Sequence, residues 1–137
     1  MKYIDRKELN ISLYDDNNEY QGKWIEIINA KCSNVLIGVF YRHPRRDSDK
    51  SFNDNLNNSI KKIEKENKTI IITGYFNYDL LKHSKNQHIR GFLDIMLDNF
   101  LQPCIPEPTR VIDGNKPSIV DNIFTNIIDK QIMSENF

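Results

Sequence analysis

Apolar residues recur along the chain in two patterns, one typical of β-strands and the other of α-helices. Residues 9–14 and 24–28 alternate apolar and polar side chains around a turn-rich segment, which predicts an antiparallel pair at a sheet edge. Residues 35–41 and 70–72 form short apolar runs rich in β-branched side chains, and such runs are typical of strands buried on both faces. A last strand is predicted over residues 118–125.

Two segments repeat their apolar residues at helical spacing. The first helix is predicted to follow a cap at Ser48 or Asp49, with a one-sided apolar stripe. The stripe consists of Phe52, Leu56, Ile60 and Ile63. The second helix is predicted from about Gln87 to Asn99, and its core-facing residues are Ile89, Phe92, Leu93, Met96 and Leu97. Pro103, Pro106 and Pro108 are expected to prevent regular structure up to about residue 109.

The first helix lies between two predicted buried strands. Strand, helix and strand together take about forty residues, the length of a parallel crossover unit. The pattern therefore predicts an α/β fold. With 137 residues, 39% of them hydrophobic, the chain corresponds to a single domain, residues 1–137.

Charge and hydropathy narrow the classes of function. The formal net charge is zero, which argues against a surface built mainly to hold nucleic acid by charge. No apolar run approaches the roughly 18 residues of a membrane helix, and residues 1–10 do not form a signal peptide. We therefore expect a protein inside the cell, in nucleus or cytoplasm, without a membrane partner. The sequence leaves the oligomeric state open.

Polar residues follow the apolar strand that ends at Gly74. Tyr75, Asn77 and Asp79 alternate there, at the sheet edge where open α/β folds place their ligands. The same residues are also typical of a loop that satisfies a strand end, and without further evidence this interpretation is favoured. The other predicted strands also carry polar groups near their ends. These are Tyr41-Arg42 and Asp121-Asn122.

These segments together resemble the endonuclease/exonuclease/phosphatase family, and most closely the endonuclease domains of non-LTR retrotransposons. The resemblance rests on four motifs in order between about Trp24 and Asn126: Ile-Gly-Val-Phe-Tyr-Arg-His-Pro, Ile-Thr-Gly-Tyr-Phe-Asn-Tyr-Asp-Leu-Leu, Glu-Pro-Thr-Arg and Ser-Ile-Val-Asp-Asn-Ile-Phe-Thr-Asn. It implies a four-layer α-β-β-α sandwich, of which this chain is expected to form part. It also implies Mg²⁺-dependent phosphodiester hydrolysis, with DNA as the substrate.

The resemblance also implies roles for individual residues. Asn77 matches the family's Asn that helps hold the scissile phosphate, and Tyr41 matches a tyrosine that contacts it. Asp121 matches an aspartate that supports the catalytic histidine or the metal. Tyr75 stands where the family's Gly-Asp-Phe-Asn motif has the Asp that orients or deprotonates the attacking water.

Two further residues are expected near the substrate. Arg42 stands beside Tyr41 as in the retrotransposon branch, and Thr109 falls where related nucleases place a hydroxyl near the phosphate. No residue is assigned as a metal ligand. None of the three histidines, His43, His83 and His88, occupies the position of the catalytic histidine, and we expect them to be surface residues.

The departures from the family pattern predict a loss of activity. The family's metal-binding Glu precedes the region that this chain matches and its Ser-Asp-His motif follows it, so the sequence is interpreted as a domain truncated at both ends. With Tyr75 as well, the first hypothesis is a retrotransposon-derived nuclease domain that is inactive and binds Mg²⁺ weakly or not at all. Restoring Asp at position 75 in a chain extended at both ends is expected to restore cleavage.

Two alternatives stay open. One is a non-enzymatic module that binds nucleic acid or phosphate through Tyr41, Arg42, Arg45, Arg46 and Asn77, although the neutral net charge favours a solvated loop for the arginines. The other is an incomplete domain whose open sheet edges and apolar faces make it aggregate or depend on another chain.

Overall fold

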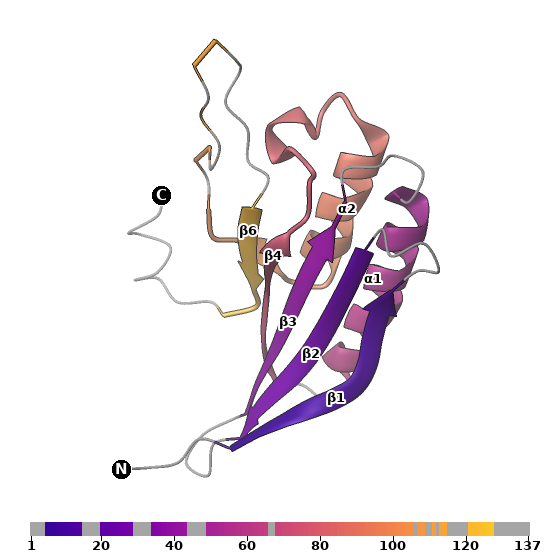
Figure 1. Cartoon of the computed structure of the whole chain (residues 1–137), viewed down its shortest axis with the longest axis vertical. Helices are drawn as coiled ribbons and strands as arrows, with labels where there is room; N and C mark the ends of the chain where they lie inside the picture. Colours follow the sequence, from indigo (N-terminus) through magenta and orange to yellow (C-terminus); the bar gives the residue numbers. More distant parts are fainter. Residues whose placement is uncertain are drawn as a thin grey trace.

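The computed structural model contains one mixed β-sheet with helices on one of its faces (Figure 1). It describes residues 5–14, 20–28, 34–43, 49–65, 68–105, 107–108, 111, 113–114 and 121–127. The six strands follow the order β1-β2-β3-β4-β6-β5. Their bounds are β1 Asp5–Tyr14, β2 Tyr20–Ile28, β3 Val35–Arg42, β4 Thr69–Tyr75, β5 Gln102–Pro103 and β6 Asp121–Thr125. The helices are α1 Asp49–Glu64, the 3-10 turn η2 Leu80–Lys82, and α2 Gln87–Asp98.

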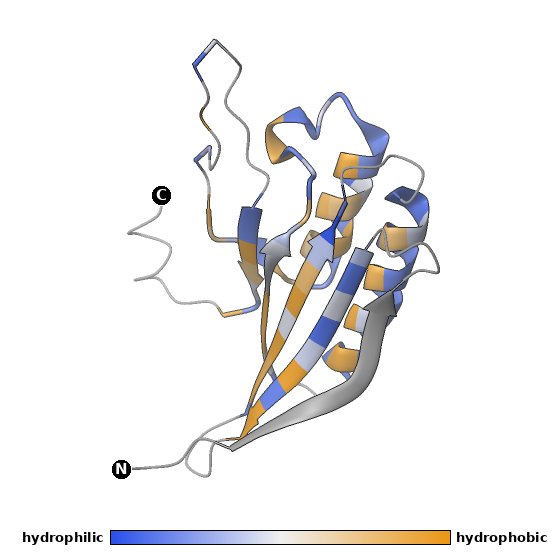
Figure 2. Ribbon diagram, viewed as in Figure 1, coloured by the Kyte–Doolittle hydropathy of each residue, from blue (hydrophilic) through white to orange (hydrophobic). Residues whose placement is uncertain are grey.

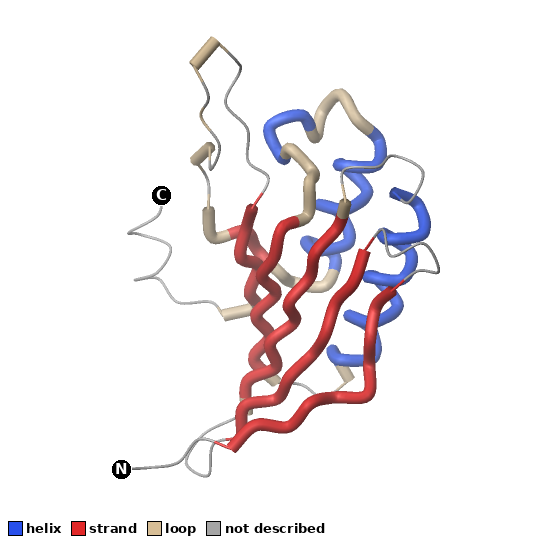
Figure 3. The backbone as a smooth tube through the Cα atoms, in the orientation of Figure 1, coloured by secondary structure: helices blue, strands red, loops and turns tan. Residues whose placement is uncertain are grey.

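The connections agree with the strand and helix patterns of the sequence. Strands β1 and β2 form an antiparallel pair at one edge of the sheet, as predicted. Strands β3 and β4 are parallel and are joined through α1, which confirms the predicted crossover unit. The colours of Figure 3 show that α1 and α2 lie on the same side of the sheet. The described residues therefore form two layers, a sheet and a helical layer.

The core lies between these two layers. All four residues of the predicted α1 stripe are fully buried, and so are Phe92 and Met96 of α2. They form one core cluster with residues of the sheet, and Figure 2 shows hydrophobic positions recurring along both helices and the central strands. These sheet residues are Trp24, Leu36, Phe40, Ile70, Ile72 and Phe124. The prediction for Leu97 is wrong: it is 47% exposed, because it lies on the flank of α2 away from the sheet.

The opposite face of the sheet is open among the described residues. Burial alternates along β3, so every second residue points away from the helices, and Val39 is 51% exposed. The prediction that the apolar runs are buried on both faces is therefore wrong for the described residues. Cross-strand register places one apolar set on this open face: Ile25, Ile27, Val35, Ile37, Val39, Ile71 and Ile123.

The C-terminal part of the sheet differs from its prediction in one detail. Despite the prolines, Gln102 and Pro103 form the two-residue strand β5 at the edge, paired with β6. Proline is tolerated in such a place because an edge strand need not donate on both sides. Residues 118–120 of the predicted last strand lie outside the described residues, whereas residues 121–125 form β6 as predicted.

Gly74 allows β4 to approach β3 closely near the end of the strands. Its φ of 156° is one that side-chain-bearing residues rarely adopt. A Cβ atom there would lie 2.0 Å from the carbonyl oxygen of Phe40. The glycine therefore keeps the ends of the two central strands in register, and the candidate site lies directly after it.

Candidate functional site

Three of the predicted site residues lie side by side at one end of the sheet. Tyr41 is paired in register with Tyr75 across the parallel β3–β4 pair, and Tyr75 is paired with Asp121 across the antiparallel β4–β6 pair. Residues in register on neighbouring strands point to the same face. Tyr41, Tyr75 and Asp121 therefore form a row on the open face of the sheet, which we call the rim.

Aromatic rings cover one part of the rim. The rings of Tyr41 and Tyr75 are nearly parallel, 18° apart, with their centroids separated by 6.1 Å. Tyr41 also contacts the His43 ring in a T-shaped arrangement, at a centroid distance of 5.1 Å. His43 is exposed, as expected from the sequence, but its contact with Tyr41 makes it part of the rim. Its position two residues beyond Tyr41 in an extended segment was the only sequence signal for this contact.

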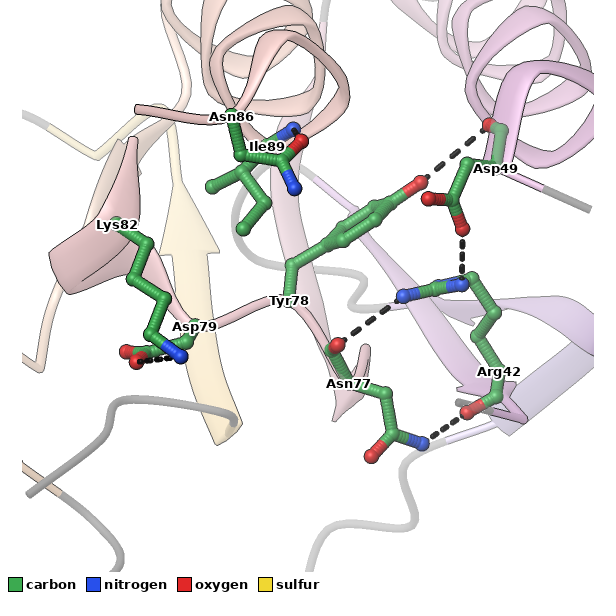
Figure 4. Close-up of a pocket in the computed structure, with 8 residues that line it drawn as sticks. All are labelled: Arg42, Asp49, Asn77, Tyr78, Asp79, Lys82, Asn86 and Ile89. Atoms are coloured by element: carbon green, nitrogen blue, oxygen red, sulfur yellow. Dashed lines mark hydrogen bonds and ion pairs between the residues drawn. The ribbon is translucent and has the colours of Figure 1, made fainter. Parts of the chain in front are cut away.

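Asn77 follows the rim in the loop after β4. Its φ of 55° lies in the left-handed region, which asparagine tolerates better than most residues. Its side-chain amide donates to the carbonyl oxygen of Arg42, and the amide oxygen points away from Arg42 (Figure 4). The preceding residue, Phe76, is buried and meets Phe92 and Phe124 at 5.0 and 6.0 Å between ring centroids. The aromatic core thus anchors the loop that presents Asn77.

Arg42 does not share the rim with Tyr41. As the next residue along the pleated strand it points to the helical side, where it is buried with 2% of its surface exposed. Its Nε donates to the Phe76 carbonyl oxygen at 2.7 Å, and its Nη2 donates to that of Asn77 at 3.1 Å. This placement favours a positioning role, holding the loop after β4, over the direct substrate contact expected from the sequence.

An ion pair and an aromatic ring complete the surroundings of Arg42. Its Nη1 lies 2.6 Å from Oδ1 of Asp49, the first residue of α1, and its guanidinium carbon lies 3.8 Å from the centroid of the Tyr78 ring. Burial raises the pKa of Tyr78, so its phenol stays neutral and donates to Oδ1 of Asn53 at 3.0 Å. A pocket of about 180 Å³ lies here on the helical side (Figure 4), and it is lined by Arg42, Asp49, Asn77, Tyr78, Asp79, Lys82, Asn86 and Ile89.

Asn122 has the same relation to Asp121 as Arg42 has to Tyr41. It points to the helical side and is buried, with 3% of its surface exposed. Its amide exchanges two hydrogen bonds of 3.1 Å with the backbone of Ile105 and accepts a third from its own neighbour, Ile123. Asn122 therefore holds the segment that follows β5. No role was predicted for Asn122 from the sequence, although its place next to Asp121 in a strand was a usable signal.

Three other predicted residues cannot be placed. Thr109, expected near the substrate, lies outside the described residues, and so do Arg45 and Arg46. Their roles stay predictions. Asp79, in contrast, has the structural role that its position suggested, since its side chain accepts from Leu81 N and caps the 3-10 turn η2.

The described residues do not fit a resident Mg²⁺ ion. Nowhere among them do three His, Cys, Asp or Glu side chains come together as a metal site. At the rim, Asp121 supplies one carboxylate, and its neighbour in register is the phenol of Tyr75. Mg²⁺ prefers carboxylate oxygens, often two of them, together with water or phosphate oxygens, and the neutral phenol of tyrosine is a poor replacement.

The described residues form an open α/β sheet with helices on one face and polar residues at the strand ends, and this combination defines the class of fold. No protein-family profile matches the sequence, and no curated protein matches it closely enough to count as a relative. Among the parts of the chain that the structure describes, no helix is long and apolar enough to cross a membrane.

Solved structures do resemble the chain. The endonuclease domain of TRAS1, a telomere-specific non-LTR retrotransposon, matches 88% of this chain over 53% of its own length, with a TM-score of 0.61 and 15% identity. A mannosyl-6-phosphatase of Bacteroides thetaiotaomicron matches 77% of the chain over 42% of its own, with a TM-score of 0.53 and 16% identity. An endonuclease/exonuclease/phosphatase family protein of the same organism matches 77% over 40%, with a TM-score of 0.52 and 16% identity.

The chain therefore has the endonuclease/exonuclease/phosphatase fold, as the sequence motifs predicted. It spans about half the length of the solved structures that it matches, or somewhat less. Among the described residues, the sheet and the helical layer correspond to two layers of the predicted sandwich.

Proposed function

We propose that residues 1–137 are part of a nuclease-related domain of the retrotransposon endonuclease type, whose rim contacts DNA without cleaving it. The fold and the similarity to a retrotransposon endonuclease domain support the relation to phosphodiester hydrolases. Tyr41 and Asp121 lie at neighbouring strand ends in register with position 75, as expected for one site. The observation that carries the loss of cleavage is Tyr75 at the centre of this row.

The chemistry of tyrosine explains the loss. A phenol has a reference pKa of about 10 against about 3.9 for the carboxyl group of Asp, so at neutral pH it is a poor proton acceptor. Removal of a positioned general base typically lowers a rate by a factor of about 10² to 10⁴. A neutral phenol also offers Mg²⁺ much less than a carboxylate does. The replacement therefore removes both the base and a potential metal ligand from one position.

No nearby carboxylate is arranged to take over as the base among the described residues. Asp79 accepts a hydrogen bond from Leu81 N at 3.2 Å and lies beside Lys82, where it lines the pocket on the helical side (Figure 4). Asp49 is held by Arg42 on the helical side of the sheet. Asp121 is in register with Tyr75, and one carboxylate there cannot serve as base and metal ligand at once.

A nicking assay tests the proposal. Purified protein is incubated with supercoiled plasmid and Mg²⁺, and the conversion to open circles is followed on a gel. We expect none above the rate without protein. The matched variant is Asn77→Ala, since Asn77 is the residue expected to hold the phosphate. Nicking that Asn77→Ala abolishes would overturn the proposal, whereas nicking that survives this change indicates a contaminating nuclease.

A further inference from the structure

Compared with the aspartate that the family resemblance implies at position 75, Tyr75 lacks a carboxylate but adds an aromatic ring. With Tyr75 in place, three rings follow one another on the open face of the sheet: Tyr75, Tyr41 and His43. Tyr41 is 38% exposed, His43 is exposed and Tyr75 is partly exposed. None of these rings belongs to the aromatic core on the other side of the sheet. An aspartate at position 75 would leave Tyr41 without its stacked partner.

The charges around the rings do not favour a site built on phosphate contacts. Arg42, the cation next to Tyr41 in sequence, points to the helical side and binds Asp49. The charged residue in register with Tyr75 is the acidic Asp121. Within the described row of the rim the charged side chain is thus acidic, while Lys23 lies on the same face one step away from the row, in register with Val39.

We propose that Tyr41, His43 and Tyr75 form a stacking platform for unpaired bases of single-stranded nucleic acid. The choice of a nucleic acid rests on the proposed function, and the choice of single strands rests on the rings. Every base has a π-face that an exposed aromatic side chain can cover, but in a duplex these faces are already stacked on one another. Rings fixed at strand ends lose little conformational freedom when they bind, because the neighbouring ring already restrains them.

Stacking predicts a salt dependence that distinguishes it from phosphate binding. A protein that neutralises several phosphates loses affinity steeply as salt rises, because counterions are released on binding. A platform of aromatic rings beside one carboxylate releases few of them. Binding to this rim should therefore change only slightly between low and physiological salt.

The experiment measures binding in EDTA, so that no cleavage can contribute. Fluorescence anisotropy follows labelled oligo(dT) and oligo(U) of about twelve nucleotides, within the span of known single-strand sites, with a duplex of equal length as comparison. We expect both single strands to bind more tightly than the duplex. Tyr75→Ala and Tyr41→Ala should each weaken binding by about ten-fold, the loss typical of one stacked base, and Tyr75→Phe should retain it within about two-fold.

The control variant is Phe100→Ala. Phe100 is 75% exposed at the C-terminal end of α2, so its removal tests whether any exposed ring binds oligonucleotides. Binding unchanged in Tyr75→Ala and Tyr41→Ala, with each variant folded by circular dichroism, would overturn the platform, as would equal losses in Phe100→Ala. Binding that disappears at physiological salt and on substitution of Arg45 and Arg46 would assign it to charge instead.

The two proposals fail separately. Nicking of plasmid in Mg²⁺ that depends on Asn77 overturns the proposed function but leaves the binding results in EDTA intact. Absence of any binding to single strands overturns the platform and leaves the absence of nicking as it stands. A preference for the duplex that Tyr75→Ala does not change overturns the platform and retains the relation to DNA endonucleases.

Discussion

The two faces of the same strand ends have opposite character. Successive residues of a pleated strand point to opposite faces, so Tyr41 and Arg42 are separated by the sheet, and so are Asp121 and Asn122. On the helical side Arg42 and Asn122 are buried. Arg42 donates to a backbone carbonyl group in the loop after β4, and Asn122 donates to one in the segment after β5. On the open side Tyr41 is exposed and contacts other rings.

This difference shows where the fold tolerates a change of chemistry. A buried guanidinium or amide that loses its partner leaves polar groups without water, which costs stability. A side chain on the open face can change type while the core and loops stay in place. Tyr75, where the family resemblance implies an aspartate, lies on the open face. The helical side should therefore control stability, and the open side should control binding.

The largest expected effect is the removal of Arg42 on the helical side. Arg42→Ala removes one ion-pair partner of the buried Asp49 and the donors to the carbonyl groups of Phe76 and Asn77. Breaking a buried pair by removal of one partner typically costs about 3–5 kcal/mol. We expect a loss of that size in the free energy of unfolding, measured by urea denaturation.

The chain offers a matched control in the same helix. Lys50 and Asp54 form an ion pair of 2.9 Å on the surface of α1, with both side chains mostly exposed. Because water screens such a pair, Asp54→Ala should leave the stability close to that of the unchanged protein. Equal losses in Arg42→Ala and Asp54→Ala would contradict the assignment of Arg42 to the framework of the loop.

A smaller effect is expected for the pair of neighbours on β6. Asn122→Ala removes the partner of both backbone groups of Ile105 and should cost about 1–3 kcal/mol. Asp121→Ala, one residue earlier on the open face, should cost less than Asn122→Ala because Asp121 is less deeply buried. Urea denaturation of both variants checks the difference, and a larger loss in Asp121→Ala would reverse the roles assigned to the two faces.

The sequence predicted the elements well because their signals are local. The apolar spacing of α1 and the β-branched runs of β3 and β4 each depend on a single segment. The motif order predicted the fold even though the identity to the solved structures is only 15–16%. The rim row of Tyr41, Tyr75 and Asp121 could also be predicted from the sequence, since strands of one sheet bring their polar ends together.

The face that each residue occupies was harder to predict. Arg42 was grouped with Tyr41 because they are neighbours in sequence, yet the pleat separates them, and the partner that holds Arg42 is the later residue Asp49. Burial on both faces was inferred from apolar runs, but such runs show only that each face is apolar, and coverage depends on which layers pack there. Leu97 fits the helical period as well as Met96 does, and only the position of the sheet distinguishes them.

The smallest expected effect concerns the open face and the aspartate that the family resemblance implies at position 75. Tyr75→Asp places a carboxylate in register with Asp121, and like charges directly opposite each other should destabilise the protein by about 0.5 kcal/mol. Two carboxylates at one sheet edge are also the ligands that Mg²⁺ prefers. Since an ion that binds only the folded state stabilises it, millimolar Mg²⁺ should raise the melting temperature of Tyr75→Asp.

Two comparisons assign that response to the charge at position 75. The asparagine in Tyr75→Asn has the size of aspartate but no charge. The melting temperature of this variant should therefore not respond to Mg²⁺, and neither should that of the unchanged protein. Thermal melts of the three proteins with and without Mg²⁺, at equal ionic strength, measure the difference. If all three respond equally, the ion binds elsewhere, and Tyr75 is not what separates this rim from a metal-binding one. If only Tyr75→Asp responds, one substitution on the open face is enough to exchange an aromatic surface for a cation site, because the loops held by Arg42 and Asn122 on the other face stay in place.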